Sequence, residues 1–145
     1  MNKINHVQKR RSFIFCPGNK PDMIPKALSS GADMVCIDLE DAIIPEHKSI
    51  SRDSTVKAFE NLLSPKDVET LIRINDVNSK DGIEDINAIL NSKNTATGLM
   101  LPKIQSVEEV QNLEKKIIES NKNLNLHIII ETNKGLENSW SIAHS

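Results

Sequence analysis

The chain has 145 residues, of which 38% are hydrophobic and 26% are charged, and its formal net charge is −2 at pH 7. This composition is typical of a globular domain and excludes a disordered or collagen-like chain. The near-neutral charge, with three Phe, one Trp and no Tyr, provides neither the basic face nor the stacking platforms of nucleic-acid-binding proteins.

The sequence also bears on where the protein works. The first residues, Met1–Ser12, are polar and basic, and no apolar stretch of signal-peptide length follows them. No apolar run approaches the roughly 20 residues of a membrane span. Cys16 and Cys36 lie inside predicted strands, where free cysteines act as small buried hydrophobes. We therefore expect a soluble, cytoplasmic protein that contacts neither membrane nor nucleic acid.

Short hydrophobic runs alternate with amphipathic segments along the chain. In chain order we expect a strand at 12–16, a helix at about 21–29, a strand at 34–39, a helix at about 47–63, a strand at 70–74, a helix at about 82–91, a strand at 98–101, a helix at about 106–120, a strand at 126–130 and a helix beginning near 136. Ser106 followed by Glu109 is the signature of a capping box. The repeating order predicts a parallel sheet with right-handed crossovers.

Two α/β architectures fit this order of elements. One is a doubly wound sheet, and the other is part of a (β/α)8 barrel. The first strand is not followed by Gly-x-Gly-x-x-Gly, and there is no Walker-type Gly-Lys-Ser/Thr. This argues against the commonest nucleotide-binding members of the doubly wound class.

Charged and polar residues follow several of the predicted strands. Because side chains alternate along a strand, Asp38 and Glu40 share one face, and so do Arg73 and Asn75. Barrel enzymes carry their chemistry at the carboxyl ends of the strands. If this face points inward, Glu40 lies within reach of Arg73 and holds the guanidinium for a carboxylate or a developing oxyanion. The alternative is a buried structural salt bridge.

Glu131 and Lys103 are further candidates. Glu131 follows an apolar run and is suited to bind Mg²⁺, which favours oxygen ligands; the alternative is a solvated strand end or a helix cap. Lys103 could contact a phosphate or carboxylate, or lie in solvent with its stem over apolar neighbours. His127 has the parity of Glu131 and is interpreted as structural, filling the interior. Lys48 is interpreted as part of a solvated helix face.

Six segments of the chain, taken together, resemble one family. They read RSFIFCPGNKPDM at 11–23, GAD at 31–33, DLEDA at 38–42, RIN at 73–75, LPK at 101–103 and IET at 130–132. In this order and spacing they resemble citrate lyase β-subunit-like proteins of the HpcH/HpaI aldolase superfamily, which also contains malyl-CoA and citramalyl-CoA lyases. Each segment alone is unspecific, but six in order are strong evidence.

This resemblance implies a TIM barrel of which residues 12–145 supply about the first five β/α units, preceded by an N-terminal extension, 1–11. It implies a Mg²⁺-dependent lyase, usually a homotrimer, that cleaves a 3-hydroxyacyl thioester of coenzyme A or acyl-carrier protein into an acyl thioester and a 2-oxo acid. The implied roles are Glu131 as a metal ligand, Arg73 as the group stabilising the enolate, Glu40 as the residue orienting Arg73, and Asp41 as a partner of metal-bound water. Lys103 and Asn19 would contact the substrate and its carrier.

The resemblance also implies a second metal ligand, an Asp on the strand after Glu131, which would lie on the C-terminal side of Ser145. Two alternatives follow. The chain could be an inert or assembly-only half-barrel, alone or with a complementing chain. It could also be a class II aldolase acting on free hydroxy-oxo acids, although the opening segment and the DLEDA segment favour the thioester lyases.

Overall fold

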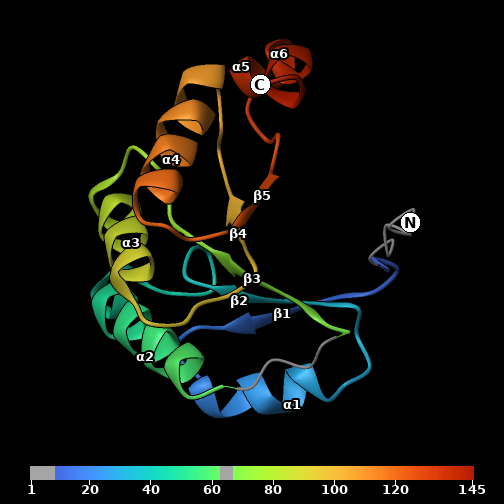
Figure 1. The fold of residues 1–145 in the computed structure, drawn as a ribbon, viewed down its shortest axis with the longest axis vertical. Helices are drawn as coiled ribbons and strands as arrows, with labels where there is room; N and C mark the ends of the chain where they lie inside the picture. Colours follow the sequence, from blue (N-terminus) through green and yellow to red (C-terminus); the bar gives the residue numbers. More distant parts are fainter. Residues whose placement is uncertain (1–8, 63–66) are drawn as a thin grey trace.

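The computed structural model describes residues 9–62 and 67–145, and in them one five-stranded parallel sheet carries the fold (Figure 1). The strands are β1 (Phe13–Pro17), β2 (Met34–Asp38), β3 (Glu69–Arg73), β4 (Gly98–Leu101) and β5 (Asn125–Ile128). The helices are α1 (Ile24–Leu28), α2 (Lys48–Glu60), α3 (Lys80–Asn91), α4 (Val107–Glu119), α5 (Asn133–Glu137) and α6 (Ser139–Ala143).

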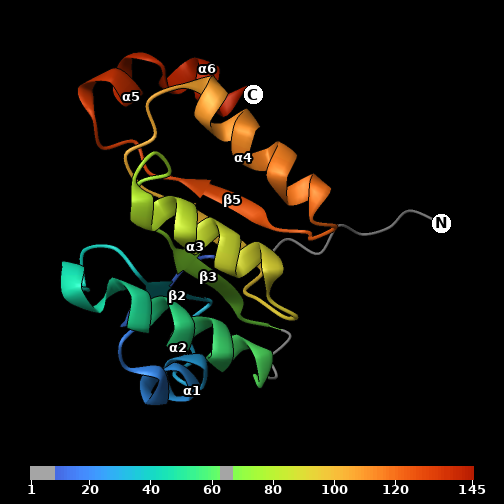
Figure 2. The same cartoon turned by 90° about the vertical axis from the view of Figure 1, so that its left-hand side faces the viewer.

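The strand order decides between the two architectures. Neighbouring strands follow the chain order β1-β2-β3-β4-β5, so each new strand is added on the same side of the last. Helices α1 to α4 consequently line one side of the curved sheet (Figures 1 and 2). A doubly wound sheet needs a reversal of strand order that puts helices on both faces. The sheet is the wall of a (β/α)8 barrel, as the barrel interpretation predicts.

The main core lies between the sheet and these helices. Outward-facing strand residues such as Val35, Ile72 and Leu99 belong to one buried cluster with helix residues such as Phe59 and Ile89. Each such side chain contributes about 1.5–3 kcal/mol by leaving water. This packing fixes the strands against one another, and with them whatever projects from their other face.

The other face of the sheet is the interior of the barrel wall. Met34, Cys36 and Leu71 form a second, smaller cluster there, with Met100 packed against it. Phe15 on β1 remains 48% exposed. Burial raises the pKa of the Cys36 thiol to about 12, so this cysteine acts as an apolar residue, as the sequence indicates.

An ion-pair group closes the amino-terminal end of the inner face. Arg10 Nε lies 2.6 Å from Glu69 Oε2, and His127 Nε2 lies 3.0 Å from Glu69 Oε1. The hydrogen bond from Arg10 holds the pKa of Glu69 below its usual value. His127 therefore does lie inside the wall. Of the predicted N-terminal extension, residues 9–11 are described and 1–8 lie outside the described residues.

Several element boundaries differ from the prediction. The helix expected at 21–29 is a 3₁₀ turn followed by α1, and the one expected at 47–63 ends at Glu60, while residue 63 lies outside the described residues. The last helical segment starts earlier, at Asn133, and is interrupted at Asn138. β5 ends at Ile128, so Glu131 lies in the loop after the strand. None of the described helices is long and apolar enough to cross a membrane.

Candidate active site

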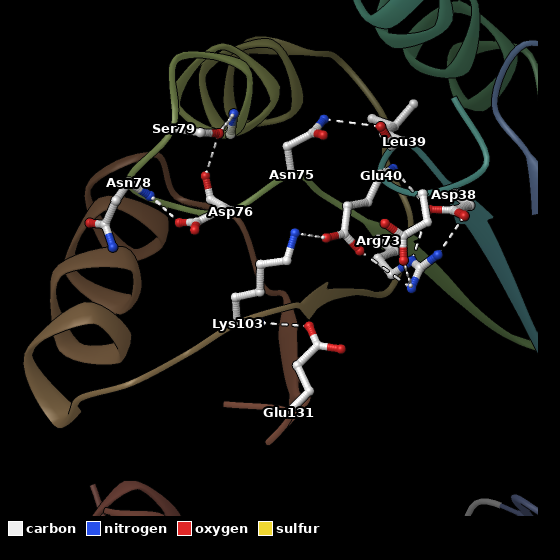
Figure 3. Close-up of polar contacts among 12 residues, drawn as sticks. Asp38, Leu39, Glu40, Arg73, Asn75, Asp76, Asn78, Ser79, Lys103 and Glu131 are labelled. Carbon is white, nitrogen blue, oxygen red and sulfur yellow. Dashed lines mark hydrogen bonds and ion pairs between the residues drawn. The ribbon is translucent and has the colours of Figure 1, made fainter. Parts of the chain in front are cut away.

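Asp38 and Arg73 form the centre of the site. They are the last residues of β2 and β3 and are register partners across the two strands. Arg73 Nε donates to Asp38 Oδ1 at 2.8 Å, and Arg73 Nη2 donates to Asp38 Oδ2 at 2.6 Å (Figure 3). Met34 and Leu71 share their parity and pack on the inner face, so this two-point ion pair also faces the interior, at the carboxyl ends of the strands.

Two more carboxylates surround the guanidinium. Arg73 Nη1 lies 3.3 Å from Glu40 Oε2 and 3.6 Å from Asp41 Oδ2. The Arg73 guanidinium also lies over the Phe15 ring, 5.0 Å from its centroid, which is a favourable cation–π distance. The hydrogen bond to Asp38 and the three negative charges together raise the pKa of Arg73 further above its normally high value. Arg73 is thus a permanent cation held in one orientation.

Asp38, and not Glu40, makes the closest contacts with Arg73. Burial by itself would raise the pKa of Asp38, but hydrogen bonds from Arg73 and from the Glu40 main chain outweigh it and lower that pKa. Asp38 also accepts from the main-chain N–H groups of Glu40, at 2.8 Å, and Ala42, at 3.1 Å. One carboxylate therefore orients the guanidinium and shapes the loop that carries Glu40. Glu40, which the sequence analysis expects to orient Arg73, also lies within ion-pair distance of the guanidinium.

Lys103 joins Glu40 to Glu131. Its side-chain Nζ lies 2.8 Å from Glu40 Oε1, and its main-chain N–H donates to Glu131 Oε1 at 2.9 Å (Figure 3). Lys103 has a φ of 57°, in the left-handed region that non-glycine residues seldom adopt. Strained backbone of this kind gathers at functional sites. In this conformation the main chain of Lys103 binds Glu131 while its side chain contacts Glu40. The contact with Glu40 raises the pKa of Lys103.

Glu40 is nearly buried, at 4% exposed, yet its carboxylate is incompletely satisfied. Lys103 and Arg73 are close enough for ion pairs, but within the described residues neither Glu40 oxygen receives a well-directed hydrogen bond. The two cations are close enough to attract the Glu40 carboxylate. Because neither oxygen accepts a hydrogen bond with good geometry, both can still accept one from a ligand. A buried acceptor of this kind normally has a donor, so Glu40 is suited to face a ligand.

Asn19 lies apart from this group. It is exposed in the loop after β1, and within the described ranges its side chain makes no hydrogen bond. The loop itself lies at the same end of the sheet, because Gly18 N–H donates to the Asp38 carbonyl at 2.9 Å. A Cβ at Gly18 would lie 2.6 Å from the Leu39 side chain and 2.8 Å from Thr55. The glycine is what allows this close approach.

The site has the chemistry of a hard-cation site but only part of a ligand set. All its acidic groups offer oxygen, and the four carboxylates of Asp38, Glu40, Asp41 and Glu131 outnumber the two cations, Arg73 and Lys103. Such an excess of negative charge suits a divalent cation. Among the described residues, however, no three His, Cys, Asp or Glu residues converge closely enough to hold a metal. Of the two oxygens of Glu131, Oε1 accepts from the Lys103 main-chain N–H, and Oε2 accepts no hydrogen bond from the described residues.

Sequence reasoning paired Asp38 with Glu40 but assigned Asp38 no role, and it missed Phe15. Parity alone placed both carboxylates on one face. Strand register, which decides which of them meets Arg73, is set by packing between strands that are distant in sequence. The aromatic residue on β1 opposite this group was the signal that could have predicted the cation–π contact.

Comparison with known proteins connects this geometry to one family. Residues 11–145 match the family model described as HpcH/HpaI aldolase/citrate lyase. The chain is 29% identical to citrate lyase subunit beta of Escherichia coli K12 over 146 residues, which is 96% of this chain and 47% of that protein. It is 34% identical to human mitochondrial citramalyl-CoA lyase over 136 residues, covering 89% of this chain and 39% of that protein.

Solved structures agree with this likeness. RipC from Yersinia pestis superimposes with a TM-score of 0.73 and 29% identity over 94% of this chain and 54% of RipC. The citrate lyase beta subunit of M. tuberculosis, complexed with oxaloacetate and magnesium, gives a TM-score of 0.69 and 28% identity over 92% of this chain and 54% of that one. The chain spans about half the length of the curated relatives it matches.

Proposed function

The chain belongs to the HpcH/HpaI aldolase/citrate lyase family, and from that premise we propose that it supplies part of the active site of a Mg²⁺-dependent carbon–carbon lyase. The substrate is a 3-hydroxyacyl thioester such as a citryl, malyl or citramalyl thioester. The products are an acyl thioester and a 2-oxo acid. Support comes from relatives named citrate lyase subunit beta and citramalyl-CoA lyase.

The fixed orientation of the Arg73 guanidinium is the main support for the proposal. Cleavage breaks the bond between the α-carbon and the hydroxyl-bearing carbon. The hydroxyl loses its proton and becomes the carbonyl of the 2-oxo acid, and the electron pair of the broken bond enters the thioester as an enolate that is then protonated. Negative charge therefore grows on the thioester oxygen. A guanidinium already fixed by Asp38, Glu40 and Asp41 can stabilise that charge without reorganising first.

Lys103 and Glu40 are proposed to act next to Arg73. The Lys103 side chain is 47% exposed although its ammonium pairs with Glu40, so the lysine can still attract the carboxylate of a 2-oxo acid. Glu40 keeps the two cations apart, and Asp41, exposed at the rim, can accept from bound water. Asn19, in the loop at the same end of the sheet, is proposed to meet the thioester carrier; a structural neighbour was crystallised with magnesium, acetoacetate and coenzyme A.

Glu131 is proposed as the Mg²⁺ ligand contributed by these residues. The Lys103 N–H bond to Oε1 would hold the carboxylate in place, in the way that hydrogen bonds around a metal site orient its ligands. When bound, the metal would act as a Lewis acid on the carbonyl of the 2-oxo acid. One protein carboxylate binds Mg²⁺ weakly, so the proposal requires at least one further ligand from outside the described residues, in a longer chain, a complementing chain or another subunit.

The test is a direct assay of the three thioesters. Protein purified from its native source, so that any polypeptide completing the metal site stays with it, is incubated with each thioester and Mg²⁺. The released 2-oxo acid is followed by a dehydrogenase-coupled reaction, with and without EDTA. The proposal expects cleavage that EDTA abolishes and that Arg73→Lys strongly reduces. Cleavage of the free hydroxy-oxo acids with equal efficiency would establish the aldolase alternative. Release of free coenzyme A without a 2-oxo acid would indicate hydrolysis, the activity named in a relative called (3S)-malyl-CoA thioesterase, 30% identical.

A second candidate, an assembly module without activity of its own, is favoured by the exposed inner face. Phe13 is 37% and Phe15 48% exposed there, and β1 and β5 pair on one side only within the described sheet. Unpaired strand edges are sites of association. Sedimentation shows whether the chain is monomeric, and a monomer that cleaves a thioester would exclude this candidate.

A further inference from the structure

Lys48, at the start of α2, makes contacts unlike those of a solvated lysine. Its Nζ donates to the main-chain carbonyls of Leu39, at 2.9 Å, and Glu40, at 2.6 Å, and to Asn75 Oδ1, at 2.6 Å. An ammonium has three donors, so all three are used, and each acceptor is an uncharged oxygen. The expectation that Lys48 belongs to a solvated helix face is wrong, because the ammonium turns towards the loop that follows β2.

Asn75 is itself held from the other side. Its amide Nδ2 donates to the Leu39 carbonyl at 3.0 Å and to Asp85 Oδ2 at 2.7 Å, and its N–H donates to the same Asp85 oxygen at 2.9 Å (Figure 3 shows the bond to Leu39). Asp85 on α3 is fully buried. Its other oxygen accepts from Arg52 Nε at 2.7 Å. Asn75 is thus fixed, and offers Lys48 a fixed acceptor.

Lys48 and Arg52 are four residues apart on α2 and therefore lie on one face of that helix. Arg52 extends the network through ion pairs with Asp81 and Glu84, at 3.1 and 2.9 Å. The two basic residues connect α2 and α3 to the strand ends, and the network ends at the main chain of Leu39 and Glu40. This main chain carries the Glu40 carboxylate, which faces Arg73 and Lys103.

We propose that Lys48 is a positioning residue for Glu40, and through Glu40 for the Arg73 guanidinium. Glu40 lies beyond the last paired residue of β2, so the strand ladder does not fix it. The Glu40 N–H donates to Asp38, and Lys48 adds a bond to the Glu40 carbonyl. The proposal deepens the proposed function, on which its kinetic readout depends.

Removing the ammonium should leave the fold intact. The Glu40 carbonyl also accepts from Ile43 N–H at 3.1 Å, and the Leu39 carbonyl also accepts from Asn75. Neither carbonyl is left without a donor when Lys48 is replaced. Among the described residues only Asn75 Oδ1 loses its donor, so the cost of a buried unpaired group falls on one amide oxygen. The loop loses its bonds from Lys48, while its bonds to Asp38 remain. The helix and strand remain as well, which is the condition for a clean test.

The test replaces Lys48 by Met, which keeps the aliphatic stem and removes the donors. Lys57→Met is the matched control, because Lys57 is on the same helix and exposed. We expect Lys48→Met to lower kcat for thioester cleavage by about ten-fold, with KM within about two-fold, because the loss falls on transition-state stabilisation. Lys57→Met should match the wild type. Methylammonium should restore part of the activity of Lys48→Ala, whereas tetramethylammonium, which has no N–H, should not.

A second readout does not need activity. The ¹⁵N resonance of Arg73 Nε reports the setting of the guanidinium, and it should move in Lys48→Met and stay in Lys57→Met. If the wild type cleaves no thioester but this resonance moves, the proposed function fails and the positioning role stands. If the wild type is active, an unchanged kcat in Lys48→Met overturns the positioning role. If the wild type is inactive, an unmoved Arg73 Nε resonance in that variant overturns it. If Lys48→Met does not fold, Lys48→Arg replaces it; the planar guanidinium cannot bring three donors to one point, and wild-type values in that variant would overturn the role.

Discussion

Asp38 and Arg73 face each other as register partners at the ends of two neighbouring strands and share two hydrogen bonds, of 2.8 and 2.6 Å. Only 4% of the Asp38 side chain and 15% of the Arg73 side chain are exposed. A shielded two-point pair of this kind is stronger and more directional than a surface ion pair. It converts the register of two strands, which hydrophobic packing determines, into the orientation of a cation at the proposed site.

Asp38→Asn should weaken both the site and the fold. The amide NH₂ turns donors towards the Arg73 donors, and the loop N–H groups of Glu40 and Ala42 lose a charged acceptor. We expect a loss of roughly 1–3 kcal/mol in the free energy of unfolding, measured by urea denaturation, and a kcat lower by about 100-fold. Asp41→Asn is the stability control, since its side chain is 74% exposed. Equal stability losses in the two variants would contradict this account of Asp38.

The order of strands and helices along the chain and several local signals were predictable from sequence, because they depend on residues close together in the chain. The capping box is an example: Ser106 Oγ accepts from Glu109 N–H, while the Glu109 side chain accepts from Ser106 N–H. The contact of Asp38 with Arg73 depends on register, and the bond from the Lys103 N–H to Glu131 joins loops that are 28 residues apart in the chain. Lys48 looked like any helix-surface lysine, because its acceptors are main-chain carbonyls and one amide that only the folded chain brings together.

The folded protein should lose stability in acid through Asp38 and Glu69, because both carboxyl groups have folded-state pKa values below their usual ones. A carboxyl group whose pKa is lower in the folded state contributes stability above its unfolded pKa, about 4. That contribution is lost as the pH falls through the folded pKa. Urea denaturation should therefore show a free energy of unfolding that falls as the pH is lowered through the ordinary carboxyl pKa of about 4.

Glu69→Gln should flatten this dependence, since it removes one of the carboxyl groups with a lowered pKa. It also leaves the Arg10 guanidinium and His127 without their shared carboxylate. The variant should be less stable than the wild type at neutral pH and approach it in acid. Parallel curves for the two proteins would show that Glu69 does not contribute to the acid sensitivity.

Metal binding should separate Glu131 from Lys103. In the protein together with any chain that completes the metal site, Glu131→Ala removes the proposed ligand and should abolish Mg²⁺ binding measured by calorimetry. Lys103→Ala keeps the main-chain N–H that holds Glu131 and removes a positive charge from the neighbourhood, so its affinity for Mg²⁺ should equal or exceed that of the wild type. The same affinity in both variants would rule out Glu131 as the ligand.

Gly135 should affect the position of the Glu131 carboxylate through the packing of α5. It is the third residue of α5, which is capped by Thr132, directly after Glu131. A Cβ at Gly135 would collide with the carbonyl of Ile104, next to Lys103. Gly135→Ala should therefore push α5 away from the Lys103 loop, cost roughly 1–3 kcal/mol of stability as overpacking does, and weaken Mg²⁺ binding by displacing Glu131.

Gly31→Ala is the control for Gly135→Ala. Gly31 has a φ of 85°, and a Cβ at this position would meet nothing within 4 Å, so alanine there costs about 1 kcal/mol of backbone strain without touching the site. Both variants should melt at lower temperature than the wild type, but only Gly135→Ala should lose Mg²⁺ affinity. Loss of affinity in both would mean that metal binding follows global stability. Retention in both would mean that the Glu131 carboxylate finds its place without help from α5, and that the Lys103 N–H alone is enough to hold it.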